Sequence, residues 1–254
     1  MIHNLVSQIR RALNLGDLES SPEDIQHDIS KQKFQEEMIA FYSQFVKTGD
    51  LCFDVGANIG DKAKVFLELG ARVVCIEPQP NCVDVLKRKY QNDSKVVIVS
   101  KGLATQPGNR SLSICGSAGT ISTFSEKWKT GRFSTYTWEP AVDVPVTTLD
   151  ALIQEFGAPN FCKIDVEGFE YEVLRGLSTP ISSLAFEFTR EFIDDARLCI
   201  EYLGSLGCAD FNYALGETPS LVLSSWTDGN TVFESMEQNT DELLWGDIYV
   251  RFHF

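Results

Sequence analysis

Short apolar runs alternate with amphipathic stretches from about residue 50 to residue 206. Runs of five or six apolar residues predict buried strands, and apolar residues spaced three or four apart predict helices between them. Strands that alternate with helices predict an α/β fold with a mostly parallel, doubly wound sheet and helices on both faces. The predicted elements are strand 51–55, helix 60–69, strand 72–77, helix 80–90, strands 95–100 and 110–115, helix 147–156, strand 160–165, helix 168–176, strand 183–188, helix 190–206 and strands near 209–214, 220–224 and 246–253.

The first 33 residues have a different pattern, in which short apolar stretches alternate with acidic ones. Apolar residues at helical spacing predict one helix over residues 2–13, and Ser-Ser-Pro-Glu-Asp at 20–24 begins a second. Residues 34–48 form an amphipathic helix that leads into the first strand. We therefore predict a helical arm, residues 1–33, and a second domain, residues 34–254. The arm covers the core or forms a partner interface, and the alternative is a flexible terminus.

A glycine turn follows the strand 51–55. The strand contains Asp54, and Gly56 and Gly60 follow it before the next helix. Glycine lets the backbone approach a ligand that a Cβ atom would exclude. Glu77 and Pro78 end the next strand, where a carboxylate can accept two hydrogen bonds from a ribose diol. Together these features predict an adenosine-containing cofactor across two neighbouring strand ends.

The spacing of the turn indicates which cofactor this is. Dinucleotide-binding proteins have G-x-G-x-x-G, whereas this chain has D-x-G-x-x-x-G. Asp54 would repel a pyrophosphate, but it suits S-adenosylmethionine (SAM), which carries a sulfonium and an ammonium group and has no phosphate. The alternative is a strand–helix turn that binds nothing. If SAM binds, the residues expected to shape its turn are Gly56, Ala57, Asn58 and Gly60, with Asp54 facing the methionine, Glu77 the ribose and Leu103 the adenine.

A third motif, residues 161–170, carries several charged side chains. In an extended segment Lys163, Asp165 and Glu167 point to the same side. Asp165 lies near the carboxyl end of its strand, and ligands of open α/β sheets bind at that edge. The alternative for Asp165 is capping or a structural ion pair. For Glu167 it is stabilisation by the dipole of the helix that it opens.

These motifs, taken in order, resemble the FkbM family of SAM-dependent methyltransferases. The resemblance rests on residues 54–60 (DVGANIG), 77–78 (EP), 146–150 (VTTLD), 163–168 (KIDVEG) and 186–188 (FEF), and it covers roughly residues 50–190. It implies the class I methyltransferase fold, whose sheet ends in antiparallel strands, and O-methylation, often of sugars or sugar-bearing products. A small-molecule or glycan acceptor is therefore expected.

The candidate acids for catalysis are Asp165 first, then Glu167 and Glu187. The three histidines lie near the termini, so a base is expected to be a carboxylate, a lysine or a tyrosine. We expect no metal, although three carboxylates at one sheet edge could hold a divalent cation instead. Two other classes of function stay open. One is a binding or scaffold protein that kept the fold without catalysis, and the other is an oxidoreductase with a nucleotide cofactor.

Two segments are candidates for acceptor binding. Residues 115–145 combine Trp128, Trp138 and other aromatic residues with lysine and arginine, a composition suited to stacking on a sugar and pairing with an anion. We expect this long segment to form a lid over the acceptor. The alternative is a surface hairpin anchored by its own aromatic residues. Residues 214–240 form a second candidate wall.

The composition of the chain disfavours several classes of binding partner. The formal net charge of −14 over 254 residues argues against binding to nucleic acid or to an anionic membrane surface. The sequence has no run of 18 apolar residues, as a membrane span would require, and no secretion signal is recognised at its start. Seven cysteines without a C-x-x-C motif are typical of a reducing cytoplasm, which is the expected location. The oligomeric state is not determined by the sequence.

Overall fold

The structure is a computed structural model that describes residues 22–116 and 121–254. It separates into two compact units, residues 1–38 and 39–254. One continuous helix, α2 (Pro22–Tyr42), replaces the two helices predicted to begin near residues 20 and 34. No glycine or proline interrupts residues 23–42, so nothing in the sequence breaks the helix. The helix predicted for residues 2–13 lies outside the described residues.

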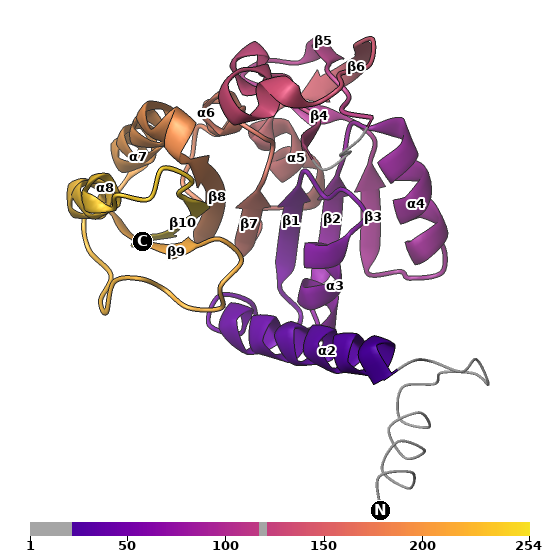
Figure 1. The fold of residues 1–254 in the computed structure, drawn as a ribbon, viewed down its shortest axis with the longest axis horizontal. Coiled ribbons are helices and arrows are strands. Elements are labelled where there is room, and N and C mark those ends of the chain that lie inside the picture. Colours follow the sequence, from indigo (N-terminus) through magenta and orange to yellow (C-terminus); the bar gives the residue numbers. More distant parts are fainter. Residues whose placement is uncertain (1–21, 117–120) are drawn as a thin grey trace, which may run out of the picture. The chain divides into compact units, whose positions relative to one another are not determined.

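The second unit contains a seven-stranded sheet with the order β3-β2-β1-β7-β8-β10-β9. Its first five strands in that order run parallel, and β10 pairs antiparallel with both β8 and β9. This is the class I methyltransferase topology that the resemblance implies, with its antiparallel ending (Figure 1). The strands are β1 (Leu51–Val55), β2 (Arg72–Ile76), β3 (Val96–Val99), β7 (Phe161–Ile164), β8 (Ser183–Thr189), β9 (Ala209–Leu215) and β10 (Trp245–Phe252).

The register of the parallel strands aligns their carboxyl ends. Val55, the last residue of β1, lies opposite Ile76 of β2 and Ile164 of β7. On the next strand, β8, the partner of Ile164 is Phe186. The residues that follow these four positions therefore share one edge of the sheet, and they are Gly56, Glu77, Asp165 and Glu187.

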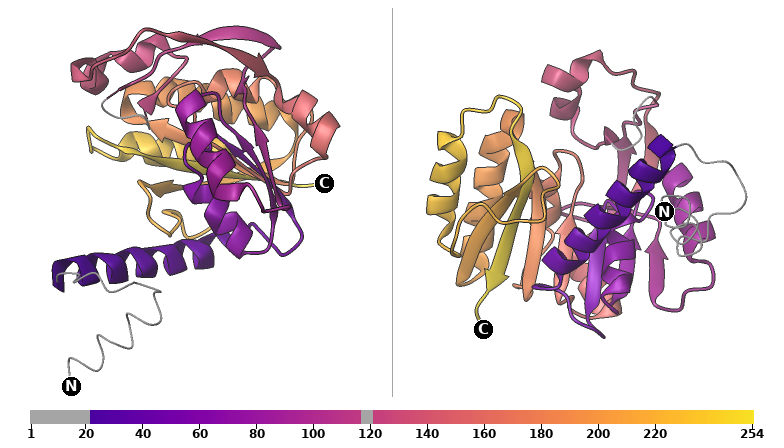
Figure 2. Two further views of the ribbon diagram at one scale, coloured as in Figure 1. Left: turned by 90° about the vertical axis from the view of Figure 1, so that its right-hand side faces the viewer. Right: turned by 60° about the horizontal axis from the view of Figure 1, so that its bottom comes forward.

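A small second sheet lies beyond this edge. It has the order β4-β6-β5 and consists of β4 (Gly102–Leu103), β5 (Gly108–Leu112) and β6 (Val142–Thr147). Figure 1 shows it above the carboxyl ends of β1 and β2, and both views of Figure 2 keep it at the same edge. The strand predicted at 110–115 corresponds to β5, whereas β4 and β6 were not predicted. The small sheet thus covers the edge of the large sheet at which the candidate residues lie.

Helices cover both faces of the large sheet (Figure 1). They are α3 (Asp61–Glu68), α4 (Pro80–Tyr90), α5 (Leu149–Phe156), α6 (Glu170–Leu174), α7 (Ile193–Leu206) and α8 (Gly229–Gln238), with short 3-10 helices η2 (Glu126–Lys129), η3 (Gly131–Thr135) and η4 (Arg190–Phe192). The sequence missed α8, although Asp228 is a regular N-cap whose Oδ1 accepts the N–H of Thr231 at 3.0 Å.

The strand predicted at 220–224 is wrong, because the segment runs as a loop. The side-chain amide of Asn212 forms hydrogen bonds to the backbone of this loop, where a strand would have formed a β ladder. Asn212 Oδ1 accepts the N–H of Leu223 at 3.1 Å, and its Nδ2 donates to the carbonyl of the same residue at 2.9 Å. A buried side chain therefore satisfies backbone groups that a neighbouring strand would otherwise pair.

Aromatic side chains fill the space where the chain enters β1. Tyr42 packs edge-on against Phe66 and Phe161 with ring centroids 5.3 Å and 5.8 Å apart, and Phe45 stacks on Tyr249 at 5.1 Å. All seven cysteines are free, and Cys208 alone is exposed. None of the helices in the described ranges is both long and apolar enough to span a bilayer. The cytoplasmic location stays a prediction.

Candidate active site

The turn after β1 is tied to β2 by its backbone. The N–H groups of Gly56 and Ala57 both donate to the carbonyl of Ile76, at 2.9 Å and 3.1 Å. Gly56 has a φ of +80°, and a Cβ atom there would lie 1.8 Å from the carbonyl oxygen of Asp165. Only glycine therefore allows the ends of β1 and β7 to approach so closely.

Glu77 closes the other side of this turn. Its Oε2 accepts the N–H of Asn58 at 2.8 Å, and its Oε1 accepts the N–H of Gln79 at 2.7 Å. Burial raises the pKa of Glu77 to about 7, although these two hydrogen bonds favour the charged form. Each oxygen has a second lone pair, so the carboxylate can accept a further hydrogen bond on each side.

Asp54 lies behind the turn and is almost fully buried. Burial raises its pKa to about 6, while Lys163 and the backbone N–H of Ala63 stabilise the charged form. Its Oδ2 has no hydrogen-bond partner among the described residues. Such an orphaned buried acceptor is costly, so it marks a place where a positively charged or hydrogen-donating group would be stabilised.

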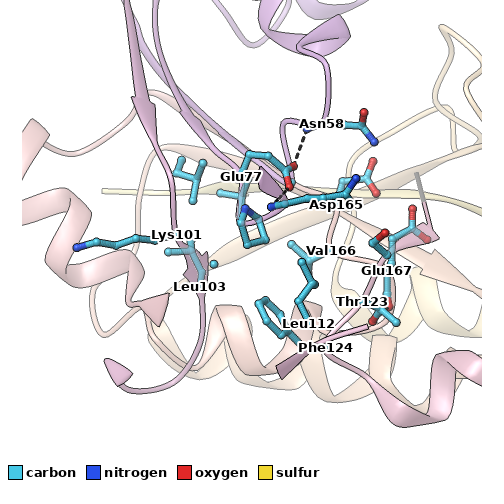
Figure 3. Close-up of a pocket in the computed structure, with 17 residues that line it drawn as sticks. Asn58, Glu77, Lys101, Leu103, Leu112, Thr123, Phe124, Asp165, Val166 and Glu167 are labelled. Carbon is cyan, nitrogen blue, oxygen red and sulfur yellow. Dashed lines mark hydrogen bonds between the residues drawn. The ribbon is translucent and has the colours of Figure 1, made fainter. Parts of the chain in front are cut away.

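A pocket of about 520 Å³, its open mouth included, lies between the turn and the small sheet. Figure 3 shows Lys101 and Leu103 on one side of Glu77, and Asp165 and Glu167 on the other. Five of the eight predicted cofactor residues line this pocket, namely Gly56, Asn58, Glu77, Pro78 and Leu103. The other three do not line it, and they are Asp54, Ala57 and Gly60. Gly60 instead accepts hydrogen bonds from Lys89 and Tyr90 of α4.

The turn after β7 is held in an uncommon conformation. Glu167 has a φ of +57°, which is unfavourable for a residue with a side chain. Its carbonyl accepts the Oγ1–H of Thr123 at 2.6 Å. Glu170 Oε1 accepts the N–H groups of Val166 and Gly168 at 3.0 Å and 3.3 Å. These contacts hold the strained turn at the mouth of the pocket, where such strain is typical of functional sites.

Lys163 lies beneath this turn and is only 1% exposed. Its Nζ lies 3.0 Å from Asp165 Oδ2 and 3.0 Å from Asp247 Oδ1. Burial alone would lower the pKa of Lys163, but the attraction of Asp165 and Asp247 outweighs it and the pKa is raised well above its ordinary value. Lys163 and Asp165 therefore point to one side, as the strand alternation predicted.

The three predicted catalytic acids come together. Asp165, Glu167 and Glu187 each place a carboxylate oxygen within 4.8 Å of the other two. Burial raises the pKa of Glu187 well above its ordinary value, and the charges of Asp165 and Glu167 raise it further. The oxygens are spaced closely enough to bind a divalent cation or to act on a hydroxyl group.

The segment 115–145 contributes to the site unevenly. Ser122, Thr123 and Phe124 line the pocket, and Trp128 is buried against Gly168. Trp138 lines neither of the two pockets described in this structure.

The sequence missed Asp247 as a partner of Lys163, and it missed the pocket wall formed by Lys101, Thr123 and Phe124. Asp247 comes from an antiparallel strand 84 positions away (247 − 163), and no local pattern links the two residues. The Thr123 hydroxyl and the Phe124 ring gain their places only through tertiary packing.

Comparisons with known proteins identify the family of the chain. Residues 54–209 match the methyltransferase FkbM domain, which is more than half of the chain. The hexuronic acid methyltransferase AglP of Haloferax volcanii is 28% identical over 155 residues, and the match covers 60% of this chain and 60% of that protein.

Among solved structures, an O-methyltransferase from Bacillus cereus in complex with SAH has a TM-score of 0.44 at 11% identity, covering 98% of this chain and 90% of its own. Precorrin-6y C5,15-methyltransferase from Geobacter metallireducens has a TM-score of 0.44 at 10% identity, covering 93% and 92%. The match to the FkbM domain confirms the resemblance drawn from the motifs. The chain therefore belongs to the FkbM methyltransferase family, and its cofactor is S-adenosylmethionine.

Proposed function

We propose that this protein transfers the methyl group of SAM to a hydroxyl group of a sugar or sugar-bearing small molecule. The observation that carries the proposal is the cluster of Asp165, Glu167 and Glu187 at the edge of the 520 Å³ pocket. The similarity to the Haloferax volcanii hexuronic acid methyltransferase supports a sugar as the acceptor class.

The pocket residues fit SAM by their chemistry. Glu77 has lone pairs left for the two ribose hydroxyls, and Leu103 offers an apolar surface for adenine. Asp54 does not line the pocket, but its buried, unpartnered oxygen places negative charge behind the turn, and this favours the cationic methionine end. When bound, SAM supplies a methyl group that is already activated for transfer.

The protein then has two tasks, orientation and proton removal. Asp165 is fixed by its ion pair with Lys163, so it suits orienting the acceptor hydroxyl. Glu187 has the raised pKa of a better proton acceptor, so we assign it the role of base and Glu167 a supporting role. Orientation can contribute several kcal/mol, and a base about 10²–10⁴-fold.

The alternatives make different predictions. A scaffold protein of this fold would bind SAM without transferring its methyl group. An oxidoreductase would bind NAD, but Asp54 and the D-x-G-x-x-x-G turn disfavour a pyrophosphate.

Methyl-labelled SAM, incubated with a panel of methyl glycosides and uronates, tests the proposal. We expect label in a product that survives mild alkali, because a methyl ether is stable there and a methyl ester is hydrolysed. Transfer should fall strongly in Glu187→Gln, a variant that keeps the shape of the side chain. No transfer to any sugar, or label only in alkali-labile ester, would contradict hydroxyl methylation.

A further inference from the structure

A second pocket of about 310 Å³, mouth included, lies on the other side of the carboxylate cluster. It shares no lining residue with the first pocket. Glu187 lines it, and the Glu187 carboxylate lies within 4.8 Å of Asp165 and Glu167, which line the first. The three acids therefore separate a cofactor pocket from a second cavity, and neither the family match nor the relatives assign a ligand to that cavity.

Two buried polar groups in this pocket lack partners. Trp128 is 2% exposed and Thr189 is 4% exposed, and both residues line the cavity. Neither Trp128 Nε1 nor Thr189 Oγ1 has a hydrogen-bond partner within the described part of the chain. Buried polar atoms are almost always paired, so an orphaned donor and an orphaned hydroxyl in one cavity indicate that a polar ligand completes them.

The indole of Trp128 is fixed by its neighbours. It stacks between Phe133, with centroids 4.5 Å apart and planes at 15°, and Phe192, at 5.2 Å and 20°. Gly168 leaves room for the indole, because a Cβ there would lie 2.6 Å from its Cε3 atom. A donor held this firmly loses little freedom on binding, and this favours specific recognition.

The charges of the pocket select among polar ligands. The charged residues that line it are all acidic, namely Glu170, Glu187 and Asp195. The nearby Lys127 is paired with Asp195, with Nζ 3.4 Å from Oδ1. A ligand carboxylate would lose its hydration there without gaining a positive partner, whereas hydroxyl groups can donate to the acids and accept from the indole.

We infer that this second pocket binds an uncharged, hydroxyl-bearing edge of the methyl acceptor, with Trp128 and Thr189 as hydrogen-bonding groups, so that the acceptor is a neutral sugar and not a uronate. The inference rests on the proposed function, because it places the acceptor beside the same three acids. The proposed acceptor is therefore uncharged, whereas the relative is a methyltransferase of hexuronic acid, which carries a carboxylate.

Nuclear magnetic resonance of the indole N–H groups tests this directly. The chain has four tryptophans, and Trp128→Phe identifies the signal of Trp128. With SAH saturating, we expect methyl glucoside, mannoside, galactoside or rhamnoside to shift that signal saturably. Methyl glucuronide at equal concentration should leave it in place. The signal of Trp138, whose Nε1 is also buried without a partner but lies outside both pockets, is the internal control.

The inference is overturned if no neutral glycoside moves the Trp128 signal, if the glucuronide moves it at lower concentration, or if Trp138 moves equally. Thr189→Val and Trp128→Phe should each raise the KM of the neutral acceptor about tenfold and leave SAH affinity within about twofold. Trp138→Phe should change neither, and unchanged KM in both pocket variants would also overturn it. Transfer of labelled methyl from SAM to an alkali-stable product, measured over the full panel of sugars, tests the proposed function separately, because that readout does not depend on which sugar occupies the second pocket.

Discussion

The backbone N–H of Asn58 donates to Oε2 of Glu77 at 2.8 Å, so the turn after β1 and the end of β2 are joined through one carboxylate. The partner oxygen of the same group holds Gln79. Glu77 therefore both joins the two strand ends and lines the pocket with a carboxylate. Its protonation should affect the fold and the ligand in opposite directions.

The first prediction concerns the pH dependence of SAH binding. Glu77 accepts hydrogen bonds best as a carboxylate, and burial raises its pKa to about 7. SAH affinity should thus rise between pH 6 and pH 8, and calorimetry at several pH values measures it. Glu77→Gln should remove most of this dependence, and Glu77→Ala should cost about 1.5–3 kcal/mol of binding. An unchanged pH dependence in the glutamine variant would place the ribose contact elsewhere.

The raised pKa of Glu77 makes the stability of the fold change with pH in the opposite direction to SAH affinity. A carboxyl group whose pKa is raised on folding, from 4.5 to about 7, binds more protons in the folded than in the unfolded protein over that interval. Its contribution to the free energy of unfolding is therefore largest below pH 4.5 and is lost as the pH rises through 7. Urea unfolding of the parent and of Glu77→Gln across this range measures the difference.

Gly56 and Gly49 form a matched pair for testing the close approach of β1 and β7. Both have positive φ, +80° and +89°, but a Cβ at Gly56 meets the Asp165 carbonyl and one at Gly49 meets nothing within 4 Å. Gly49→Ala should cost about 1–2 kcal/mol from φ alone. Gly56→Ala should cost at least about 3 kcal/mol in urea unfolding. Equal losses would show that the contact relaxes easily.

Asp165→Asn tests the division of roles within the acid cluster. We expect folding and SAH affinity to be nearly unchanged and kcat to fall at least about tenfold. Removing this negative charge should also lower the pKa of Glu187, so the rising limb of the pH–rate profile should move to lower pH. Asp247→Asn also removes a partner of Lys163 but leaves the cluster intact, and should move the limb less. Activity within about twofold of the parent would exclude Asp165 as the orienting acid.

Chelation tests the use of the three acids as a metal site. Lys163 already brings a positive charge within 3.0 Å of Asp165, so the cluster has a counter-ion of its own. We expect EDTA to leave methyl transfer unchanged and magnesium titration to give no heat. Loss of activity that magnesium restores would instead assign Asp165, Glu167 and Glu187 to a divalent cation.

The sequence predicted the edge of the large sheet well, because that edge is built from local patterns. The turn at Gly56, the acid at Glu77 and the parity of Lys163 and Asp165 each follow from a few neighbouring residues, and parallel register brings them together. Asp247 and the small sheet are brought to the site by the pairing of strands that are far apart in the sequence, and no local pattern predicts that pairing. The strand predicted at 220–224 failed because the side chain of Asn212, and not a neighbouring strand, pairs with the N–H and the carbonyl of Leu223.

The SAM site is the claim on which the others depend, and calorimetric titration with SAH tests it most directly. We predict saturable binding at one site with an affinity on the order of micromolar, about −8 kcal/mol. The binding should weaken in Glu77→Ala and should be absent with NAD. No heat and no thermal stabilisation with SAH up to about millimolar concentration, where a binding free energy near −4 kcal/mol would still register, would contradict it.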